Sequence, residues 1–434
     1  MDKMADVLGR AGAWCGQNKY LSAIKNAFQN FMPLTIAGAI GVLWCNVLVN
    51  ESTGLGIFFK PIMALEFLNP AFQAVNFCTI SCITVGITLG IAQEIGVWNM
   101  GAEKAGYIPG LVGLAAWLSV TNTSHMVEGA KAAFTGIAGN ELGATGLFTG
   151  MIIGVLSVEL FCFFEKQDAL KIKMPEQVPP GVARAFEVLV PATITLIITA
   201  CIGSACYNLT GLYLNDVIKN GIQGPLGAVG ATIPGVMIIY LVIMLFWLVG
   251  IHGNNMLSAV KEALFTPLAL ENVEKFNKGE KPTNIINMYA LQMWGEFGGS
   301  GVTIGLVIAI MIFGKREDNK AIASLSLVPG LFNINETVTF GIPMVLNPIL
   351  GIPFVFACLV TILVGYVLTV IGFCPVACLT VPWTTPPIVF GFLACGANVM
   401  GAVTQAILIV VSTVIYVPFL ISYEKYQNKQ AAEA

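Results

Sequence analysis

Charged residues are scarce in this chain, and histidine is nearly missing. Only 10% of its 434 residues are charged, and only two are histidine. A chain with so little charge is not a large soluble enzyme. It has no nucleotide-binding pattern, and no polar stretch is long enough to house a soluble nucleotide-binding domain. The sequence therefore argues against a primary ATP-driven pump within this chain, and we expect neither a cofactor nor a nucleic-acid partner.

Paired cysteines and a cleavable signal are also missing. The 11 cysteines lie mostly in apolar segments, without the spacing of a zinc site or a disulfide framework. We interpret them as small packing residues and predict no metal site. Residues 1–30 mix basic and apolar positions and lack a small-residue cleavage site. This N-terminal segment indicates either an amphipathic or helical lead-in on the cytoplasmic face, or a solvated tail.

Apolar residues and glycine are abundant instead. The chain is 56% apolar and contains 46 glycines, and its mean hydropathy is +0.81. These values predict an all-α polytopic membrane protein, with about ten transmembrane helices plus re-entrant hairpins. Apolar runs of suitable length recur at about 31–49, 72–93, 107–121, 143–164, 187–206, 231–250, 294–313, 351–372 and 394–420. The segments on either side of 251–272 can lie on their expected sides of the membrane only if 251–272 also crosses it or re-enters. The segment 207–230 suggests an interfacial position.

Basic residues orient the predicted spans. They gather before the first span and in the polar segment 165–186. Four predicted spans separate these two segments, so both lie on the same side of the membrane. The positive-inside rule makes both segments cytoplasmic, and it places both termini there too. Interrupted polar stretches all fall after residue 250. We therefore divide the chain into an N-terminal segment 1–30, a scaffold half 31–230, a substrate-handling half 231–420 and a cytoplasmic tail 421–434.

The segment 329–348 carries a carboxylate, Glu336, between apolar stretches, and prolines and glycines interrupt it. Burying a charge costs several kcal/mol unless it is compensated. Interrupted backbone persists in a membrane only when it is packed in protein or lines a wet cavity. We expect a re-entrant hairpin beside a substrate path. The alternative is a structural carboxylate bonded to the backbone donors of its own hairpin.

Three other features carry possible chemistry. His252 stands at the end of an apolar span between two glycines, and it is either a ligand-binding residue or a structural hydrogen-bonding residue. Trp383 lies in a proline-rich, non-helical stretch, where an indole serves as a membrane-interface anchor or as a platform for a sugar ring. The glycines of 298–301 favour close helix packing over a phosphate cradle, because no lysine follows at the required spacing.

The run Pro-Gly-Leu-Phe-Asn-Ile-Asn-Glu at 329–336, followed by Phe-Gly-Ile-Pro at 340–343 and Leu-Asn-Pro at 346–348, closely resembles a known motif. It is similar to the signature of the membrane-embedded IIC components of the bacterial sugar phosphotransferase system, lactose/cellobiose/diacetylchitobiose branch. Gly-Ile-His-Gly at 250–253 and Val-Pro-Trp-Thr-Thr-Pro-Pro at 381–387 look like two further motifs of that branch, in the expected order. One departure is visible, because Thr337 stands where the family pattern usually has proline.

The resemblance implies a sugar permease in the bacterial cell membrane. It would be a homodimer of ten-span chains, with the dimer contact in the N-terminal half and the sugar site in the C-terminal half. A disaccharide of the cellobiose, diacetylchitobiose or lactose class would move by alternating access. Phosphorylation, usually on the C6 hydroxyl, would come from a phosphocysteine on a separate IIB chain, itself supplied by IIA. The chain is then the transport subunit of a sugar phosphotransferase, without a phosphoryl donor of its own.

In that scheme Glu336 and His252 would hold the hydroxyl that is phosphorylated, with the carboxylate accepting its hydrogen bond and its proton. The predicted sugar contacts are completed by four residues around these motifs: Asn333, Asn335, Asn254 and Trp383. An ion-coupled secondary sugar transporter with Glu336 as the coupling site is the alternative. Few acidic residues lie within the spans, which weakens that alternative.

Overall fold

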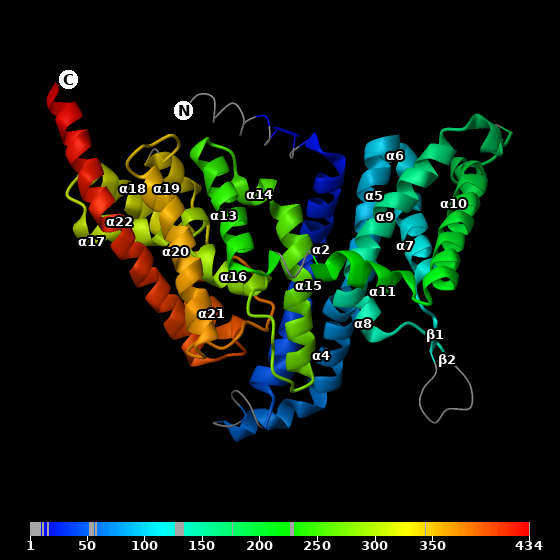
Figure 1. Cartoon of the computed structure of the whole chain (residues 1–434), viewed down its shortest axis with the longest axis horizontal. Helices are drawn as coiled ribbons and strands as arrows, with labels where there is room; N and C mark the ends of the chain where they lie inside the picture. Colours follow the sequence, from blue (N-terminus) through cyan, green and yellow to red (C-terminus); the bar gives the residue numbers. More distant parts are fainter. Residues whose placement is uncertain are drawn as a thin grey trace. The chain divides into compact units, whose positions relative to one another are not determined.

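The structure is a computed structural model of the chain, shown in Figure 1. It describes residues 10, 13–14, 17–51, 56, 59–125, 134–175, 177–225, 230–342 and 344–433. Most residues of the predicted lead-in that precede residue 17 therefore lie outside the described residues. So do Pro343, in the second part of the signature run, and Ala434, at the end of the predicted tail.

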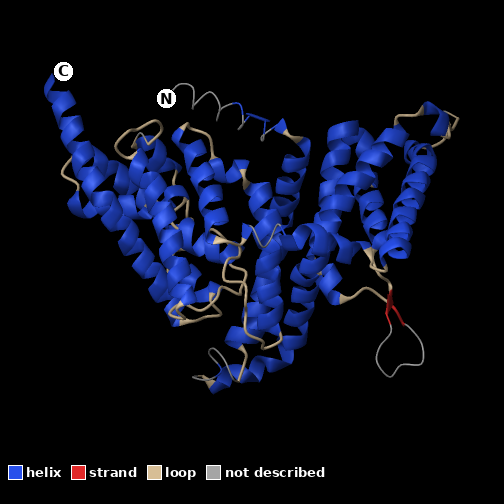
Figure 2. Ribbon diagram, viewed as in Figure 1, coloured by secondary structure: helices blue, strands red, loops and turns tan. Residues whose placement is uncertain are grey.

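Helices make up most of the described chain (Figure 2). The exception among the described elements is a two-stranded antiparallel pair, in which β1 (Ser124–His125) faces β2 (Phe134–Thr135). The prediction of an all-α protein is confirmed. The chain divides into two compact units: one contains Gln17–Gly38 and Val75–Ala228, and the other contains Met1–Gly16, Ala39–Ala74 and Val229–Ala434. We call them the scaffold unit and the site unit.

The scaffold unit is a group of closely packed helices. Isoleucine recurs every fourth residue in α5, at 83, 87, 91 and 95, and all four side chains are buried. This spacing places them on one face, which packs on α7 and α9. The helices of this unit after residue 75 are η3 (Phe77–Ser81), α5 (Ile83–Met100), α6 (Ala102–Ala105), α7 (Ile108–Val120), α8 (Gly139–Leu142), α9 (Ala144–Glu165), η4 (Asp168–Leu170), α10 (Pro180–Thr210), α11 (Leu214–Ile218) and η5 (Lys219–Gln223).

The site unit combines long helices with short, broken ones. Its longest helix, α22 (Val399–Glu433), packs on α17 and α20, and Figure 1 shows α20 beside it. The buried Tyr416 of α22 donates a hydrogen bond of 2.8 Å to the Gly301 carbonyl, which ties the long helix to a broken segment. The other helices after residue 229 are α13 (Ile233–Leu248), α14 (Gly253–Met256), α15 (Ser258–Asn277), α16 (Met288–Gly295), η6 (Ser300–Val302), α17 (Ile304–Phe313), α18 (Glu317–Leu331), α19 (Glu336–Gly341), α20 (Gly351–Val370) and α21 (Val389–Ala394).

The first long helix belongs to both units. α2 (Lys19–Leu43) continues as the π-helical turn η1 (Trp44–Leu48), so the helix that contains the predicted first span at 31–49 begins twelve residues before that span. Lys19 and Lys25, two basic residues of the predicted lead-in, lie within this helix, which favours a helical lead-in over a solvated tail for residues 19–30. η2 (Lys60–Leu68) and α4 (Asn69–Asn76) follow. The hydropathy of the apolar part set the predicted boundary, whereas the helix extends beyond that part.

Five described helices are long and apolar enough to cross a membrane: Lys19–Leu48, Ala144–Glu165, Pro180–Thr210, Gly351–Val370 and Val399–Glu433. The number rises to seven if each of two bent pairs is one span. One pair is Lys60–Ser81 with Ile83–Met100, bent by 42°, and the other is Met288–Val302 with Ile304–Phe313, bent by 59°. The predicted count of about ten spans stays a prediction.

The second bent pair corrects the prediction of a continuous span at 294–313. The helix stops after Gly295 and resumes at Ile304. Between these points Gly298, Gly299 and Gly301 have positive φ angles, which side chains with a Cβ rarely adopt. The glycines therefore form a sharp loop in mid-segment, and they do not lie on a continuous helix as a packing face.

Candidate functional site

The predicted re-entrant segment is a helix, a turn and a second short helix. α18 ends at Leu331, and the N–H groups of Phe332 and Ile334 both donate hydrogen bonds to the Pro329 carbonyl. Asn333 then takes a φ of 64°, in the left-handed region that asparagine tolerates better than most residues. Glu336 begins α19. The asparagine turn therefore separates the two helices and presents Glu336 at the start of the second one.

Asn333 joins three segments that are far apart in the sequence. Its Oδ1 accepts a hydrogen bond of 2.6 Å from the Gly298 N–H, and its Nδ2 donates to the carbonyls of Trp383 and Thr385 at 2.5 and 3.1 Å. Each of these backbone groups lies in an irregular segment, where no helix satisfies it. One side chain thus holds the glycine loop, the hairpin turn and the tryptophan loop together.

Asn335 and Asn254 continue this arrangement through Ser300. The buried Asn335 donates 2.7 Å to the Ser300 carbonyl, and Asn254 Nδ2 donates 3.0 Å to the Ser300 hydroxyl. Gly299 leaves the space for Asn335, because a Cβ there would overlap its side chain. The segment of the His252 motif and the segment of Glu336 are therefore both attached to the glycine loop.

His252 and Glu336 face each other across a short gap. His252 Nε2 lies 3.9 Å from Glu336 Oε1, and the two side chains are 38% and 49% exposed. His252 is also the N-cap of α14, where its Nδ1 accepts a hydrogen bond of 3.2 Å from the Asn255 N–H. Because Nδ1 acts as an acceptor, the neutral imidazole carries its proton on Nε2, the atom toward Glu336. The gap is too long for a good direct hydrogen bond and leaves both groups open to a ligand.

Packing fixes the orientation of the imidazole. The ring centroid of Trp247 lies 4.4 Å from that of His252, and the indole is buried. Phe354 of α20 packs against the same indole with an edge-on geometry at 6.4 Å. The histidine ring is thus held between its own helix cap and an aromatic surface, so its Nε2 points in a fixed direction.

Trp383 lies on a loop that is ordered by its own turn and by Asn333. The Thr385 N–H donates 2.9 Å to the Pro382 carbonyl, and the indole side chain is about half exposed. The half-exposed ring offers an apolar face of the kind on which a pyranose ring stacks. The structure places the loop beside the hairpin through the bonds of Asn333 to the carbonyls of Trp383 and Thr385.

The six predicted site residues therefore belong to three segments, which are connected to one another by hydrogen bonds, by the glycine loop and by the short gap between His252 and Glu336. The amides of Asn333 and Asn254 use both their oxygen and their nitrogen within the protein, and Asn335 uses its nitrogen. Their contact with a sugar stays a prediction. Within the described residues no group of three or more histidine, cysteine, aspartate or glutamate side chains forms a metal site.

Sequence reasoning missed a buried ionic cluster behind the site. The Lys261 ammonium contacts the Glu296 carboxylate, and the Tyr240 hydroxyl donates 2.6 Å to the same Glu296 oxygen. A usable signal was present, since Glu296 is a carboxylate inside the apolar run 288–313. The argument from the cost of a buried charge, which singled out Glu336, applies equally to Glu296.

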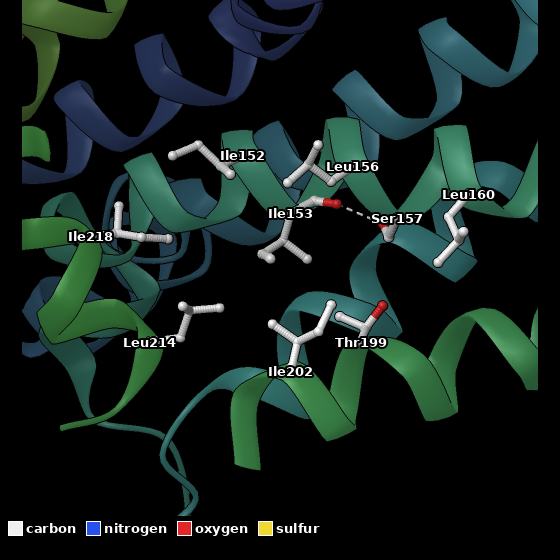
Figure 3. Close-up of a pocket in the computed structure, with 9 residues that line it drawn as sticks. All are labelled: Ile152, Ile153, Leu156, Ser157, Leu160, Thr199, Ile202, Leu214 and Ile218. Atoms are coloured by element: carbon white, nitrogen blue, oxygen red, sulfur yellow. Dashed lines mark hydrogen bonds between the residues drawn. The ribbon is translucent and has the colours of Figure 1, made fainter. Parts of the chain in front are cut away.

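A cavity of about 170 Å³ lies elsewhere, in the scaffold unit between α9, α10 and α11 (Figure 3). Isoleucine and leucine side chains form most of its wall. Its two hydroxyls are occupied within their own helices, because Ser157 donates to the Ile153 carbonyl and Thr199 to the Thr195 carbonyl. A sugar needs several directed polar partners, and the side chains of this cavity offer only the oxygens of these two hydroxyls as acceptors.

A family model described as "Phosphotransferase system, EIIC" matches residues 25–358 of the chain. The chain belongs to this family. The oligo-beta-mannoside-specific EIIC component of Bacillus subtilis (strain 168) is 32% identical to it over 428 residues, which cover 98% of this chain and 94% of the relative. The cellobiose-specific EIIC component of Lactococcus lactis subsp. lactis (strain IL1403) is 29% identical over 502 residues, with 98% of each chain covered.

A solved structure agrees with the family assignment. The crystal structure of the transporter ChbC, the IIC component from the N,N'-diacetylchitobiose-specific phosphotransferase system, superposes with a TM-score of 0.88. It is 29% identical and covers 97% of each chain. This EIIC chain is therefore a sugar-specific permease of the phosphotransferase system and a multi-pass membrane protein, and its function requires a sugar and an EIIB partner.

Proposed function

We propose that this EIIC chain carries a β-linked disaccharide across the bacterial cell membrane and presents one hydroxyl, usually that on C6, for phosphorylation. The three similar proteins described above are named for oligo-beta-mannoside, cellobiose and N,N'-diacetylchitobiose. All of these are β-linked saccharides. Their shared linkage supports a site that recognises the extended shape of a β-linked pair of rings.

The separation between His252 and Glu336 is the observation that carries the proposal. A hydroxyl oxygen placed beside a 3.9 Å gap reaches both atoms at hydrogen-bond distance. It accepts a hydrogen bond from Nε2–H of the neutral imidazole and donates its own hydrogen to the Glu336 carboxylate. Because one group donates and the other accepts, the pair orients a hydroxyl and leaves an oxygen lone pair for reaction.

The proposed reaction transfers a phosphoryl group from a phosphocysteine of the EIIB partner to that hydroxyl. A bond forms between the hydroxyl oxygen and phosphorus, the sulfur–phosphorus bond breaks, and the cysteine leaves as a thiolate. Glu336 accepts the hydroxyl proton as the new bond forms, which makes it the general base. His252 holds the oxygen in line for attack.

Trp383 supplies the platform for a sugar ring, and the three asparagines shape the site around it. The amide nitrogen of each asparagine donates a hydrogen bond to irregular backbone or to Ser300. We infer that Asn333, Asn335 and Asn254 contact the sugar through their remaining hydrogen-bonding capacity, such as the second lone pair of each amide oxygen. Their larger contribution is to hold four segments in fixed relative positions: the His252 motif, the glycine loop, the hairpin turn and the tryptophan loop.

We infer a homodimer whose contact lies in residues 31–230, with both termini cytoplasmic and sugar movement by alternating access. The basic residues around 165–186 and before residue 31 support this orientation. Cross-linking of engineered cysteines tests the contact. Efficient trapping of dimers only from positions after 250 would place it in the other half.

The decisive experiment compares Glu336→Gln, His252→Ala and the double variant in purified protein. Glu336→Gln keeps the shape but removes the negative charge, so we expect phosphorylation at saturating sugar to fall about 100-fold. Sugar affinity should change less, because an amide still forms hydrogen bonds. If both side chains hold one hydroxyl, the double variant should be clearly less impaired than the sum of the single effects. EIIB-dependent phosphorylation, sugar binding and a melting curve are measured for each protein.

A purely structural Glu336 gives a different pattern. Glu336→Gln would then lower the melting temperature and the folded yield while the folded fraction keeps its phosphorylation rate. Uptake into vesicles with and without the phosphoryl-relay proteins separates the ion-coupled alternative, because that transporter accumulates unmodified sugar on an ion gradient. Either result removes Glu336 from the proposed chemistry.

A further inference from the structure

The ionic cluster behind the site is nearly closed to solvent. The side chains of Lys261 and Glu296 are 7% and 17% exposed, and Tyr240 is fully buried. Lys261 comes from α15, Glu296 follows α16, and Tyr240 comes from α13, helices that Figure 1 shows together in the site unit. Two donors thus converge on one carboxylate oxygen.

The cluster is connected to the site by a continuous series of hydrogen bonds. Lys261 Nζ also donates 3.3 Å to Asn254 Oδ1. An ammonium has only donors, so it fixes the asparagine amide with its oxygen inward and its Nδ2 toward the Ser300 hydroxyl. The Ser300 carbonyl then accepts from Asn335 Nδ2.

This series ends next to both reacting groups. Asn254 is two residues after His252, and Asn335 is the residue before Glu336. Neither member of the ion pair has a described hydrogen bond to His252 or Glu336 themselves. The hydrogen-bonded connection from the ion pair to the gap between those two groups therefore passes through Asn254 and Ser300.

A buried ion pair is a costly way to fill a helix contact, because apolar side chains of similar volume are often as stabilising or more so. What an ion pair adds is direction, since each hydrogen bond fixes an angle as well as a distance. Here the hydrogen bonds of the ion pair orient Asn254, and through Ser300 they connect the segment of His252 with the segment of Glu336.

We propose that the Lys261–Glu296 pair, completed by Tyr240, is a positioning element that sets the separation of His252 and Glu336 for phosphoryl transfer. This inference rests on the proposed function of those two residues as the hydroxyl-holding pair. Lys261 and Glu296 touch neither the sugar nor the phosphoryl group in this arrangement. They act on the rate of transfer through the orientation of Asn254 and Ser300.

The test uses the full-length protein with phosphorylated EIIB and the double variant Lys261→Met/Glu296→Gln. Removing both charges leaves neither member of the pair as an unpaired buried ion, and Glu262 keeps its hydrogen bond from Thr266, so the protein should fold. We expect the phosphorylation rate at saturating sugar to fall about 10- to 100-fold, the scale of a misplaced reacting group. The sugar dissociation constant should stay within about threefold. Lys261→Arg keeps a cation with several donors and should retain most of the rate.

Glu165→Gln is the matched control. Glu165 is a buried carboxylate of the scaffold unit that pairs with Lys104 and Arg184 at 2.9 and 3.0 Å. It has a comparable ionic environment and no hydrogen-bonded connection to the site segments in the described contacts. Its variant should lose stability without losing phosphorylation by the folded fraction.

A folded double variant with the wild-type rate overturns the inference. So does a double variant whose sugar binding, melting temperature and rate all decline together, because that pattern is a general loss of structure. If the double variant does not fold, Ser300→Ala decides, since it breaks the link from Asn254 but leaves the ion pair. We expect its rate to fall about three- to tenfold with little change in melting temperature, and a wild-type rate overturns the inference.

Glu336→Gln, measured beside these proteins, distinguishes failure of the positioning role from failure of the proposed function of the site. Loss of phosphorylation in Glu336→Gln with a normal rate in the folded double variant refutes the positioning role alone. A normal rate in a stable Glu336→Gln protein refutes the proposed function of the site itself.

Discussion

The scaffold unit and the region around Glu336 satisfy their polar groups in opposite ways. In the scaffold unit the hydroxyls of Ser157, Thr195 and Thr199 each donate to the carbonyl four residues earlier in the same helix. Around Glu336, asparagine side chains bond to backbone or side-chain groups 35 to 52 residues away in the sequence. The difference follows from the backbone: regular helices pair their own N–H and C=O groups, whereas broken segments need partners from elsewhere.

This contrast explains why the polar site lies where the helices break. The interior of a regular helix leaves no free backbone group and no need for a buried amide, so its contacts are made by small and apolar residues. A loop within the protein requires amides, and those amides in turn hold a histidine and a carboxylate beside each other. The cost of the broken backbone is offset by the hydrogen bonds that organise the site.

Asn333→Ala should have the largest effect. The change leaves the Gly298 N–H and the carbonyls of Trp383 and Thr385 without their partner. We expect a loss of about 2 to 4 kcal/mol in the free energy of unfolding, the sum expected for several broken hydrogen bonds at irregular backbone. Sugar binding should weaken as the tryptophan loop separates from the hairpin.

Thermal melts and sugar-binding isotherms measure both effects. Asn208→Ala on α10 is the control, because that exposed side chain bonds only weakly, at 3.5 Å, to Ser204 of its own helix. Equal stability of Asn333→Ala and the wild type would mean that water replaces the asparagine without loss, and the proposed contrast would fail.

Gly113→Ala tests the other side of the comparison. A Cβ on Gly113 of α7 would overlap the Cβ of Ala92 in α5, and neither atom can rotate away. Overpacking of this kind costs about 1 to 3 kcal/mol, and the better helix propensity of alanine returns up to about 1 kcal/mol of it. We expect a lower melting temperature with an unchanged phosphorylation rate per folded molecule. A rate that falls more than the folded fraction would show that packing in the scaffold unit controls the site.

Trp383→Ala should affect binding without much effect on folding. The half-exposed indole contributes apolar contact with a sugar ring, so its loss should weaken sugar affinity by about 1 to 2 kcal/mol. The backbone bond from Asn333 to the carbonyl of residue 383 is unaffected by the side chain. Isothermal titration with the wild type, Trp383→Phe and Trp383→Ala should give a graded loss. Unchanged affinity in a folded alanine variant would assign the indole a structural role.

The sequence predicted the fold class and several helices closely. The apolar run at 143–164 corresponds to α9 (Ala144–Glu165), and 351–372 corresponds to α20 (Gly351–Val370), because a continuous apolar run and a helix end at the same polar or proline signals. The break within 294–313 was missed, since three glycines in an apolar run fit either a packing face or a loop. Only the φ angles of the folded chain distinguish these two cases.

The site was predictable in its members but not in its connections. An unusual carboxylate and a histidine between glycines stand out in a chain with so few charges. The bonds from Asn333 to Gly298 and Trp383, and from Lys261 to Asn254, join residues that no local pattern relates. Pairing across such distances depends on how the helices pack, and one sequence alone carries no information on which segments become neighbours.

Thr337→Pro should have the smallest effect, and it tests the one departure from the family motif. Thr337 is the second residue of α19, and the first described backbone bond of that helix runs from the Thr339 N–H to the Asn335 carbonyl. The first N–H groups of a helix have no acceptor within it, so proline at this position removes no helical bond. Its ring reduces the freedom of the unfolded chain, which stabilises by about 0.4 to 1 kcal/mol at compatible sites.

An opposing effect acts on Glu336, because the residue before a proline is disfavoured in the helical conformation. The two effects are of similar size, so we expect the free energy of unfolding to change by less than about 1 kcal/mol and phosphorylation by no more than about twofold. Thr337→Ala separates loss of the hydroxyl from the effect of the ring. A tenfold loss in the proline variant with a normal alanine variant would mean that Glu336 needs a freer backbone here than the family motif provides. The hairpin of this chain would then differ from its relatives in the geometry of the reacting carboxylate, not merely in one side chain.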